Sequence, residues 1–227
     1  MSTINILAWV FLGVGVVSFC IVLADICMGR YQYMRIMNIA WPITALYSGP
    51  IGLFMYFMYG RVNNLNMQGE RKPKRERKKP TWVKIYISAT HCGAGCTLAD
   101  IISEITIFWV GIHILGHTLW ASFFIDFGAA LLFGLFFQYL NIKPMRPDLT
   151  FWEALLESVK ADLFSLTAFQ LGMYGWLLAI YYMYNGTVNA GMPLYWFMMQ
   201  IGLTIGLLTT FPINAWLIRS GIKKPCA

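Results

Sequence analysis

Long apolar runs alternate with short polar segments along the 227-residue chain. A membrane-spanning helix needs roughly 20 mostly apolar residues to cross about 30 Å of hydrocarbon, and the chain holds about six runs of this length. The expected spans cover residues 4–24, 36–59, 98–119, 120–142, 162–184 and 193–217. The pattern predicts an all-α, polytopic integral membrane protein in which residues 1–227 form a single transmembrane domain surrounded by the lipid bilayer.

Residues 82–94 are too few to cross a membrane by themselves, and we expect the third span to begin near Leu98. Residues 82–97 would then lie at or below the interface. Gly93 and Gly95 would permit a broken or re-entrant backbone, which is tolerated at membrane depth only where protein buries it or water lines it. Whether residues 82–97 cross, dip or lie flat stays open at this point.

Other segments modify the picture of simple spans. Apolar residues recur at helical spacing in residues 152–159, which predicts a short amphipathic helix in the interface before the fifth span. Pro42 and Pro50 fall inside the second span and predict a kink there, because membrane helices tolerate proline. Gly202 and Gly206 form a small-residue face for close helix packing, which would also suit a homo-oligomer.

The composition is typical of a membrane protein, with 58% hydrophobic and 12% charged residues. Soluble proteins carry about 25% charged residues. The net charge of +7 is concentrated in one loop, residues 61–80, instead of being spread over a face, which argues against nucleic-acid binding. The basic residues of this loop are Arg61, Arg71, Lys72, Lys74, Arg75, Arg77, Lys78 and Lys79. Such a loop favours the cytoplasmic side and is suited to contact anionic lipid headgroups.

An even number of spans would place both termini on the side of the basic loop, which we expect to be cytoplasmic. The loop with Lys143 and Arg146 and the basic C-terminal tail fall on the same side. Arg30 and Arg35 fall on the opposite side in this arrangement and are an exception to the rule.

The stretch THCGAGCTLAD carries the most distinctive chemistry of the chain. If a helix continues through its glycines, Cys92, Cys96, Asp100 and Glu104 share one stripe, because four residues turn a helix by about 400°. Thiolates suit soft metals such as Cu(I) and Zn(II), and an imidazole adds a nitrogen ligand. Polar groups are costly inside a bilayer and therefore indicate function. We predict a copper or zinc site formed by His91, Cys92, Cys96, Asp100 and Glu104, in a protein that moves, senses or delivers the ion.

Two other interpretations of the thiols stay open. Cys92 and Cys96 would lie about 6 Å apart on a regular helix, within reach of a disulfide, so the protein could be a thiol redox protein with a quinone as one partner. Alternatively, free cysteine is often a small apolar filler, and the chain is then a structural membrane subunit.

A second polar set is expected near the outer ends of the third and fourth spans, where His113, His117 and Asp126 occur. A His pair with a carboxylate suits a metal or a proton, and it equally suits a polar contact between antiparallel neighbours. The sequence has no haem-attachment motif, Walker-type loop, His-Glu-x-x-His or Gly-x-Ser-x-Gly. It therefore predicts no particular enzyme activity and no energised pump.

Several long motifs occur together in the order MNIAWPITALYSGPIG, THCGAGCTLADIISE, FQYLNIKPM, KADLFSLTAFQLGMYGW and WFMMQIGLTIGLLTTFPINAWLIRSGIKK. In this the chain resembles, from about residue 34 to 224, a family of prokaryotic multi-pass membrane proteins catalogued as a domain of unknown function. The resemblance implies an integral protein of a prokaryotic inner or plasma membrane and carries no assigned activity. In the family that the chain resembles, some members are joined to copper-related domains, which adds slight support to the metal interpretation.

Overall fold

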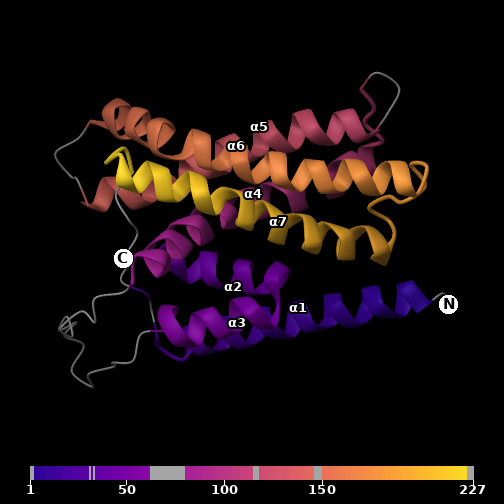
Figure 1. Ribbon diagram of the computed structural model, residues 1–227, viewed down its shortest axis with the longest axis horizontal. Coiled ribbons are helices and arrows are strands. Elements are labelled where there is room, and N and C mark those ends of the chain that lie inside the picture. The colour runs from indigo at the N-terminus through magenta and orange to yellow at the C-terminus, as the bar shows by residue number, and fades with distance from the viewer. Residues whose placement is uncertain are drawn as a thin grey trace.

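The computed structural model describes residues 3–30, 32, 34–61, 80–114, 118–145 and 150–223, and these residues form helices and no strands. Five long helices run along the longest axis of the molecule (Figure 1). They are α1 (Thr3–Cys27), α4 (Thr81–Val110), α5 (Thr118–Met145), α6 (Phe151–Met183) and α7 (Pro193–Arg219). Each contains a stretch long and apolar enough to cross a membrane. The all-α, polytopic membrane fold is thereby confirmed.

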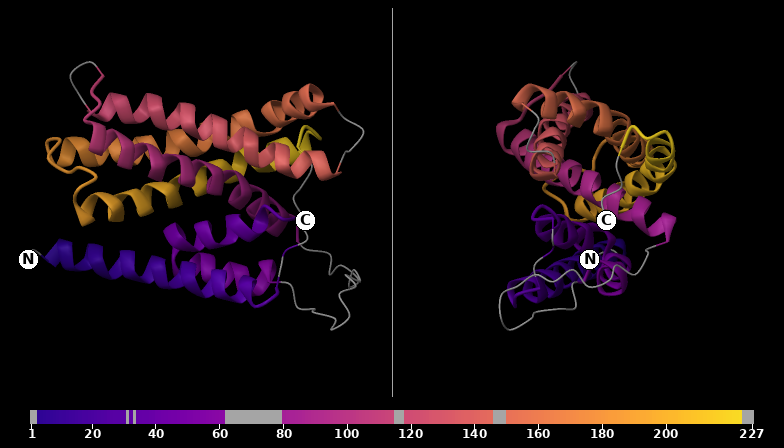
Figure 2. Two further views of the ribbon diagram at one scale, coloured as in Figure 1. Left: turned by 180° about the vertical axis from the view of Figure 1, so that it is seen from behind. Right: turned by 90° about the vertical axis from the view of Figure 1, so that its left-hand side faces the viewer.

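The second expected span is not a single helix, which is a correction to the sequence interpretation. Residues 37–60 form α2 (Met37–Ser48), α3 (Pro50–Met55) and the π-helical turn η1 (Tyr56–Gly60). Gly49 joins α2 to α3 with a φ of +55°, a conformation that favours glycine, and Pro50 begins the new helix. The chain therefore reverses within the bundle and returns to the end where α2 starts (Figures 1 and 2).

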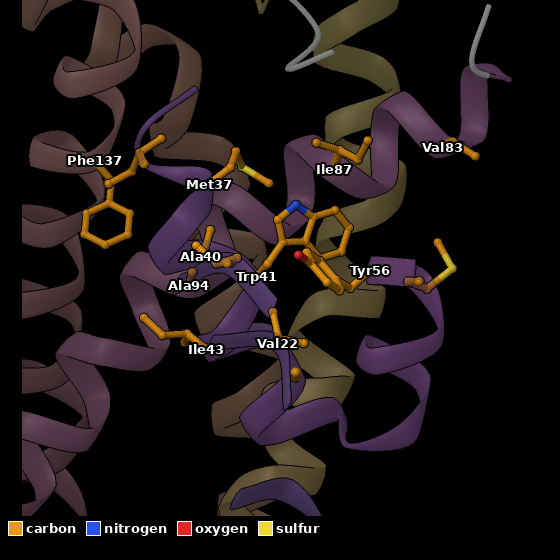
Figure 3. Close-up of a cluster of buried hydrophobic side chains, with 14 residues drawn as sticks. Val22, Met37, Ala40, Trp41, Ile43, Tyr56, Val83, Ile87, Ala94 and Phe137 are labelled. Atoms are coloured by element: carbon orange, nitrogen blue, oxygen red, sulfur yellow. The ribbon is translucent and has the colours of Figure 1, made fainter. Parts of the chain in front are cut away.

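Trp41 lies at the centre of the core that holds this hairpin in place (Figure 3). Its ring contacts Tyr56 edge-on, with ring centroids 5.7 Å apart. Val22 of α1 and the α4 residues Val83 and Ile87 belong to the same buried cluster. Burial of these apolar side chains fixes the hairpin between α1 and α4.

Neighbouring helices cover the backbone carbonyl of Leu46 near the tip of the hairpin. Gln200 of α7 donates a hydrogen bond from Nε2 to the carbonyl oxygen of Leu46 at 2.9 Å. Gly15 of α1 packs so closely that a Cβ there would collide with the same carbonyl. The irregular backbone of the hairpin is thus covered by protein, which is the condition under which a membrane tolerates such backbone.

The expectation that residues 82–97 form a segment separate from the third span is wrong. Helix α4 is unbroken from Thr81 to Val110. A Cβ on Gly93 would lie 2.9 Å from Cε2 of Phe169, and one on Gly95 would lie 3.4 Å from the Cα atom of Gly134. The two glycines therefore allow α5 and α6 to approach α4 closely and do not break the helix.

The sequence predicted a separate interfacial helix at residues 152–159. In the structure these residues are instead the first turns of α6. A capping box starts α6: the Thr150 backbone N–H donates to Oε2 of Glu153 at 2.8 Å, and the Glu153 N–H donates to Oγ1 of Thr150. Residues 151–171 contain neither glycine nor proline, so nothing in this stretch interrupts the helix.

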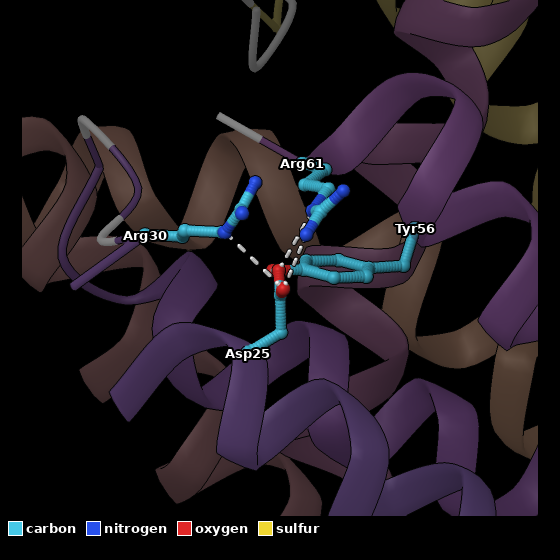
Figure 4. A network of polar contacts seen from close by, with 4 residues as sticks. All are labelled: Asp25, Arg30, Tyr56 and Arg61. Atoms are coloured by element: carbon cyan, nitrogen blue, oxygen red, sulfur yellow. Dashed lines mark hydrogen bonds and ion pairs between the residues drawn. The ribbon is translucent and has the colours of Figure 1, made fainter. Parts of the chain in front are cut away.

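Asp25, near the end of α1, contacts residues that precede and follow the hairpin (Figure 4). Its carboxylate accepts hydrogen bonds from Nη2 of Arg61 and from the hydroxyl of Tyr56, each at 2.8 Å. Arg30 adds an ion pair at 3.3 Å. The bond to Asp25 raises the pKa of Arg61. Arg30 and Arg61 therefore lie at the same end of the bundle. The sequence interpretation had placed Arg30 on the side opposite the basic loop, and the structure removes that exception.

Because the hairpin returns, the start of α1 and the end of α7 lie at opposite ends of the long axis (Figures 1 and 2). The sequence interpretation expected both on one side. Every Lys and Arg falls in residues 30–84, 143–160 or 219–224. The described parts of these stretches lie toward the end at which α7 finishes, which we call the basic end of the bundle (Figure 1). The other end has no Lys or Arg in the sequence that forms it.

We expect Gly206→Ala to destabilise the protein by about 1–3 kcal/mol through overpacking. A Cβ on Gly206 would lie 2.7 Å from the backbone oxygen of Phe169 in α6, which cannot move without shifting the helix. Gly175→Ala is the matched control, because a Cβ on Gly175 has nothing within 4 Å. Thermal unfolding in detergent measures both variants. Equal melting temperatures would show that α6 and α7 do not depend on this contact.

Candidate functional site

Cys92, Cys96, Asp100 and Glu104 lie one turn apart on the unbroken α4, and all four side chains are buried. A helix rises about 1.5 Å per residue, so this polar stripe extends about 18 Å, more than half of the roughly 30 Å hydrocarbon layer. α4 is the helix in the interior of the bundle that contacts the hairpin, α5, α6 and α7. The sequence prediction of one shared stripe is confirmed.

The two thiols lie together at the end of the stripe nearer the basic end of the bundle. Cys92 and Cys96 are both free, and their side chains lie within hydrogen-bonding reach of each other. Tyr47 at the hairpin tip and Phe169 of α6 belong to the same buried cluster. Asp162 of α6 is an electrostatic neighbour of Cys96. Tight apolar packing thus surrounds a pair of thiols with one carboxylate nearby.

His91 lies apart from this pair. Successive helical residues point about 100° apart, so His91 and Cys92 face different neighbours. The His91 ring lies 6.2 Å from the ring of Phe137 in α5. Among the described residues, no group of three or more His, Cys, Asp or Glu side chains is arranged to hold a metal ion. The five predicted ligands therefore share a helix but do not surround a common point.

Three carboxyl groups meet at the other end of the stripe. Asp100 accepts a hydrogen bond at 2.8 Å from Nε2 of Gln170, and both side chains are fully buried. Glu104 lies beside Asp126 of α5, which is also fully buried and is an electrostatic neighbour of Asp100 as well. Glu104 and Ser103 lie within hydrogen-bonding reach of the Asp126 carboxyl group. We call Asp100, Glu104 and Asp126 the carboxyl triad.

The second polar set predicted from the sequence is described only in part. His113 follows the end of α4 and is exposed, and His117 lies outside the described residues. Asp126 instead joins Glu104. Residues 104 and 126 lie at similar depth because α4 and α5 are antiparallel neighbours, but similar depth alone does not show from the sequence which side chains meet.

A buried ion pair that the sequence did not reveal lies near the thiols. Nζ of Lys223, in the segment after α7, lies 3.1 Å from Oδ1 of Asp162, and the two side chains are 0% and 2% exposed. The segment after α7 thus returns a cation to the interior. The sequence predicted a basic C-terminal tail. It does not show that the chain turns inward after Gly221 and buries Lys223.

The chain belongs to the family described as a domain of unknown function, DUF4396, whose model matches residues 81–223. The match covers the polar stripe, the triad and Lys223, whereas the hairpin of residues 37–60 lies outside it. Searches of curated proteins and of solved structures found no match.

Proposed function

Within a family that carries no assigned activity, we propose that this protein moves a soft metal ion such as Cu(I) through a prokaryotic inner or plasma membrane. Cys92 and Cys96 bind the ion, and the carboxyl groups of the same stripe take up the protons that the thiols release. The observation that carries the proposal is the buried stripe on α4, because four chemically active side chains inside a membrane bundle have a large desolvation cost without a functional use.

The order of groups along α4 suits this chemistry. A thiol binds a soft metal as a thiolate, so metal binding releases protons. Asp100 lies one turn beyond Cys96, and Glu104 one turn beyond Asp100. Carboxylates at these positions are the nearest acceptors for protons leaving the thiols along the stripe. Zinc is the second ion that the same two thiols suit.

The charge distribution supports one orientation in the membrane. The described parts of the stretches that hold Lys and Arg lie toward the basic end, and positively charged segments favour the cytoplasm. The thiols then lie toward the cytoplasmic side and the triad toward the outer side. The C-terminal end is cytoplasmic and the N-terminal end lies outside, in place of the expectation that both are cytoplasmic.

Metal binding can be measured directly. We expect the protein, purified in detergent under reducing conditions and loaded with Cu(I), to hold near-equimolar copper by elemental mass spectrometry, because two adjacent thiols suit a soft ion. Cys92→Ser/Cys96→Ser should lose it. Cys20→Ser/Cys27→Ser is the matched control, since both of these thiols are exposed on α1. Equal copper in the two double variants, or none in the unmodified protein, would refute the proposal.

Thiol redox is the second candidate, favoured by the contact between two free thiols. Formation of a disulfide would release two electrons and two protons to an oxidant such as a quinone. Thiol titration in redox buffers would find a reversible two-electron couple that disappears in Cys92→Ser/Cys96→Ser. Absence of that couple would exclude this candidate without affecting the metal proposal.

A further inference from the structure

A cavity of about 100 Å³ lies at the end of the bundle opposite the basic end. It lies among the end of α4, the start of α5, α6 and the connection between α6 and α7. Glu104, Ser122 and Tyr195 supply polar groups to its lining, and Phe108, Phe123 and Leu177 are among the apolar ones. A cavity of this size with several polar groups has room for a few water molecules.

Glu104 is the point at which this cavity meets the polar stripe. Its side chain lines the cavity, yet the residue is only 4% exposed and its Oε1 atom has no hydrogen-bond partner among the described residues. Ser122 and Tyr195 lie within hydrogen-bonding reach of the carboxyl group. A buried carboxyl group that lines a cavity with room for water is placed to exchange a proton with that water.

The charge of the triad cannot be balanced by fixed cations of the surrounding helices. The sequence has no Lys or Arg between Lys84 and Lys143, or between Lys160 and Arg219. The other titratable groups facing Glu104 are Asp100 on its own helix, Asp126 on α5, Tyr174 on α6 and Tyr195 on α7. Buried carboxylates without a cation are very costly, so a mobile positive charge must neutralise them.

A proton fits this role better than a metal ion. The carboxyl groups are electrostatic neighbours, but they are not arranged around a common point that a metal ion could occupy. A proton needs only one oxygen at a time and a water molecule to deliver it.

We propose that the cavity is a water-filled port through which Glu104 exchanges protons with the outer side, with Asp126 as the next acceptor. A hydronium ion in the cavity transfers one proton to the Glu104 carboxylate and leaves a neutral water molecule. Glu104 then passes a proton to Asp126 or Asp100 and returns to its charged form. The inference rests on the proposed route along α4, to which it adds the outer proton site.

Infrared spectroscopy of the purified protein tests this port. We expect a protonated-carboxyl band that changes with pH and shifts promptly when water is exchanged for D₂O. Glu104→Gln should remove at least part of the pH-dependent band, whereas Glu153→Gln, at an exposed carboxyl group, should leave it. Thr118→Trp, at an exposed position on the cavity lining, should slow the D₂O shift severalfold. A buried-carboxyl band that ignores pH and D₂O, or one unchanged in Glu104→Gln, would overturn the inference.

The same measurement separates the port from the metal proposal. Cys92→Ser/Cys96→Ser should lose copper and keep the exchangeable carboxyl band, since the thiols lie two turns or more from Glu104. If the unmodified protein binds no copper but shows the band, the port stands and the metal proposal fails. If copper binds and Glu104→Gln leaves the band unchanged, the port fails alone.

Discussion

Lys223→Met should destabilise the protein by about 3–5 kcal/mol, because it leaves the carboxylate of Asp162 buried without its cation. The ion pair has an N–O distance of 3.1 Å and both side chains are almost fully buried. In addition, Oδ2 of Asp162 has no hydrogen-bond partner among the described residues, so the lysine is the main compensation for the charge. Thermal or chemical unfolding in detergent measures the loss.

A double variant separates the ion pair from the packing of the C-terminal segment. Asp162→Asn/Lys223→Met should recover much of the stability, since removing both charges also removes the desolvation cost. Arg219→Met is the control, because Arg219 is exposed and such changes stay within about 0.5 kcal/mol. If the double variant is as unstable as Lys223→Met, the segment is held by its other contacts and the ion pair contributes little.

Asp126→Asn should leave the fold as stable as before, or more stable, while it abolishes proton-coupled transport. Asp126 is fully buried beside the carboxyl group of Glu104, so its charge has a large desolvation cost. Asparagine has nearly the same shape and removes the charge, and it cannot accept a proton at physiological pH. Unfolding temperature and metal uptake by reconstituted vesicles, measured on the same preparation, test the two halves.

Two results would contradict the role given to Asp126. A clear loss of stability in Asp126→Asn would indicate that the carboxylate has a partner on which the fold depends. Unchanged uptake in a stable Asp126→Asn protein would show that protons bypass this residue. Ser18→Ala is a useful comparison at a buried polar position of α1 remote from the triad, and it should alter neither property strongly.

The hydrophobic pattern was sufficient to predict the membrane class, because every long apolar run must become a helix in lipid. It did not locate the break in the chain. Gly93 and Gly95 attracted attention as a broken backbone, but they are contact points for Phe169 and Gly134. Gly49, followed directly by Pro50, is the residue at which the chain reverses. A glycine–proline pair is a stronger turn signal than two glycines without a proline.

The candidate site was predicted in part. The stripe from Cys92 to Glu104 follows from helical periodicity alone, so the sequence was enough. The sequence grouped Asp126 with His113 and His117, whereas the structure describes it beside Glu104. Pairing between helices depends on packing that one sequence does not contain. Lys223 could not be found, since only the tertiary structure shows that a basic residue of the tail is buried against Asp162.

The central claim is that the thiols of α4 carry a soft metal ion through the membrane while the triad moves protons. Uptake of Cu(I) into reconstituted vesicles that contain a pH-sensitive dye tests it most directly. The account predicts copper uptake with an accompanying change of internal pH, present in Cys20→Ser/Cys27→Ser and absent in Cys92→Ser/Cys96→Ser. Copper uptake that persists without Cys92 and Cys96 would contradict it.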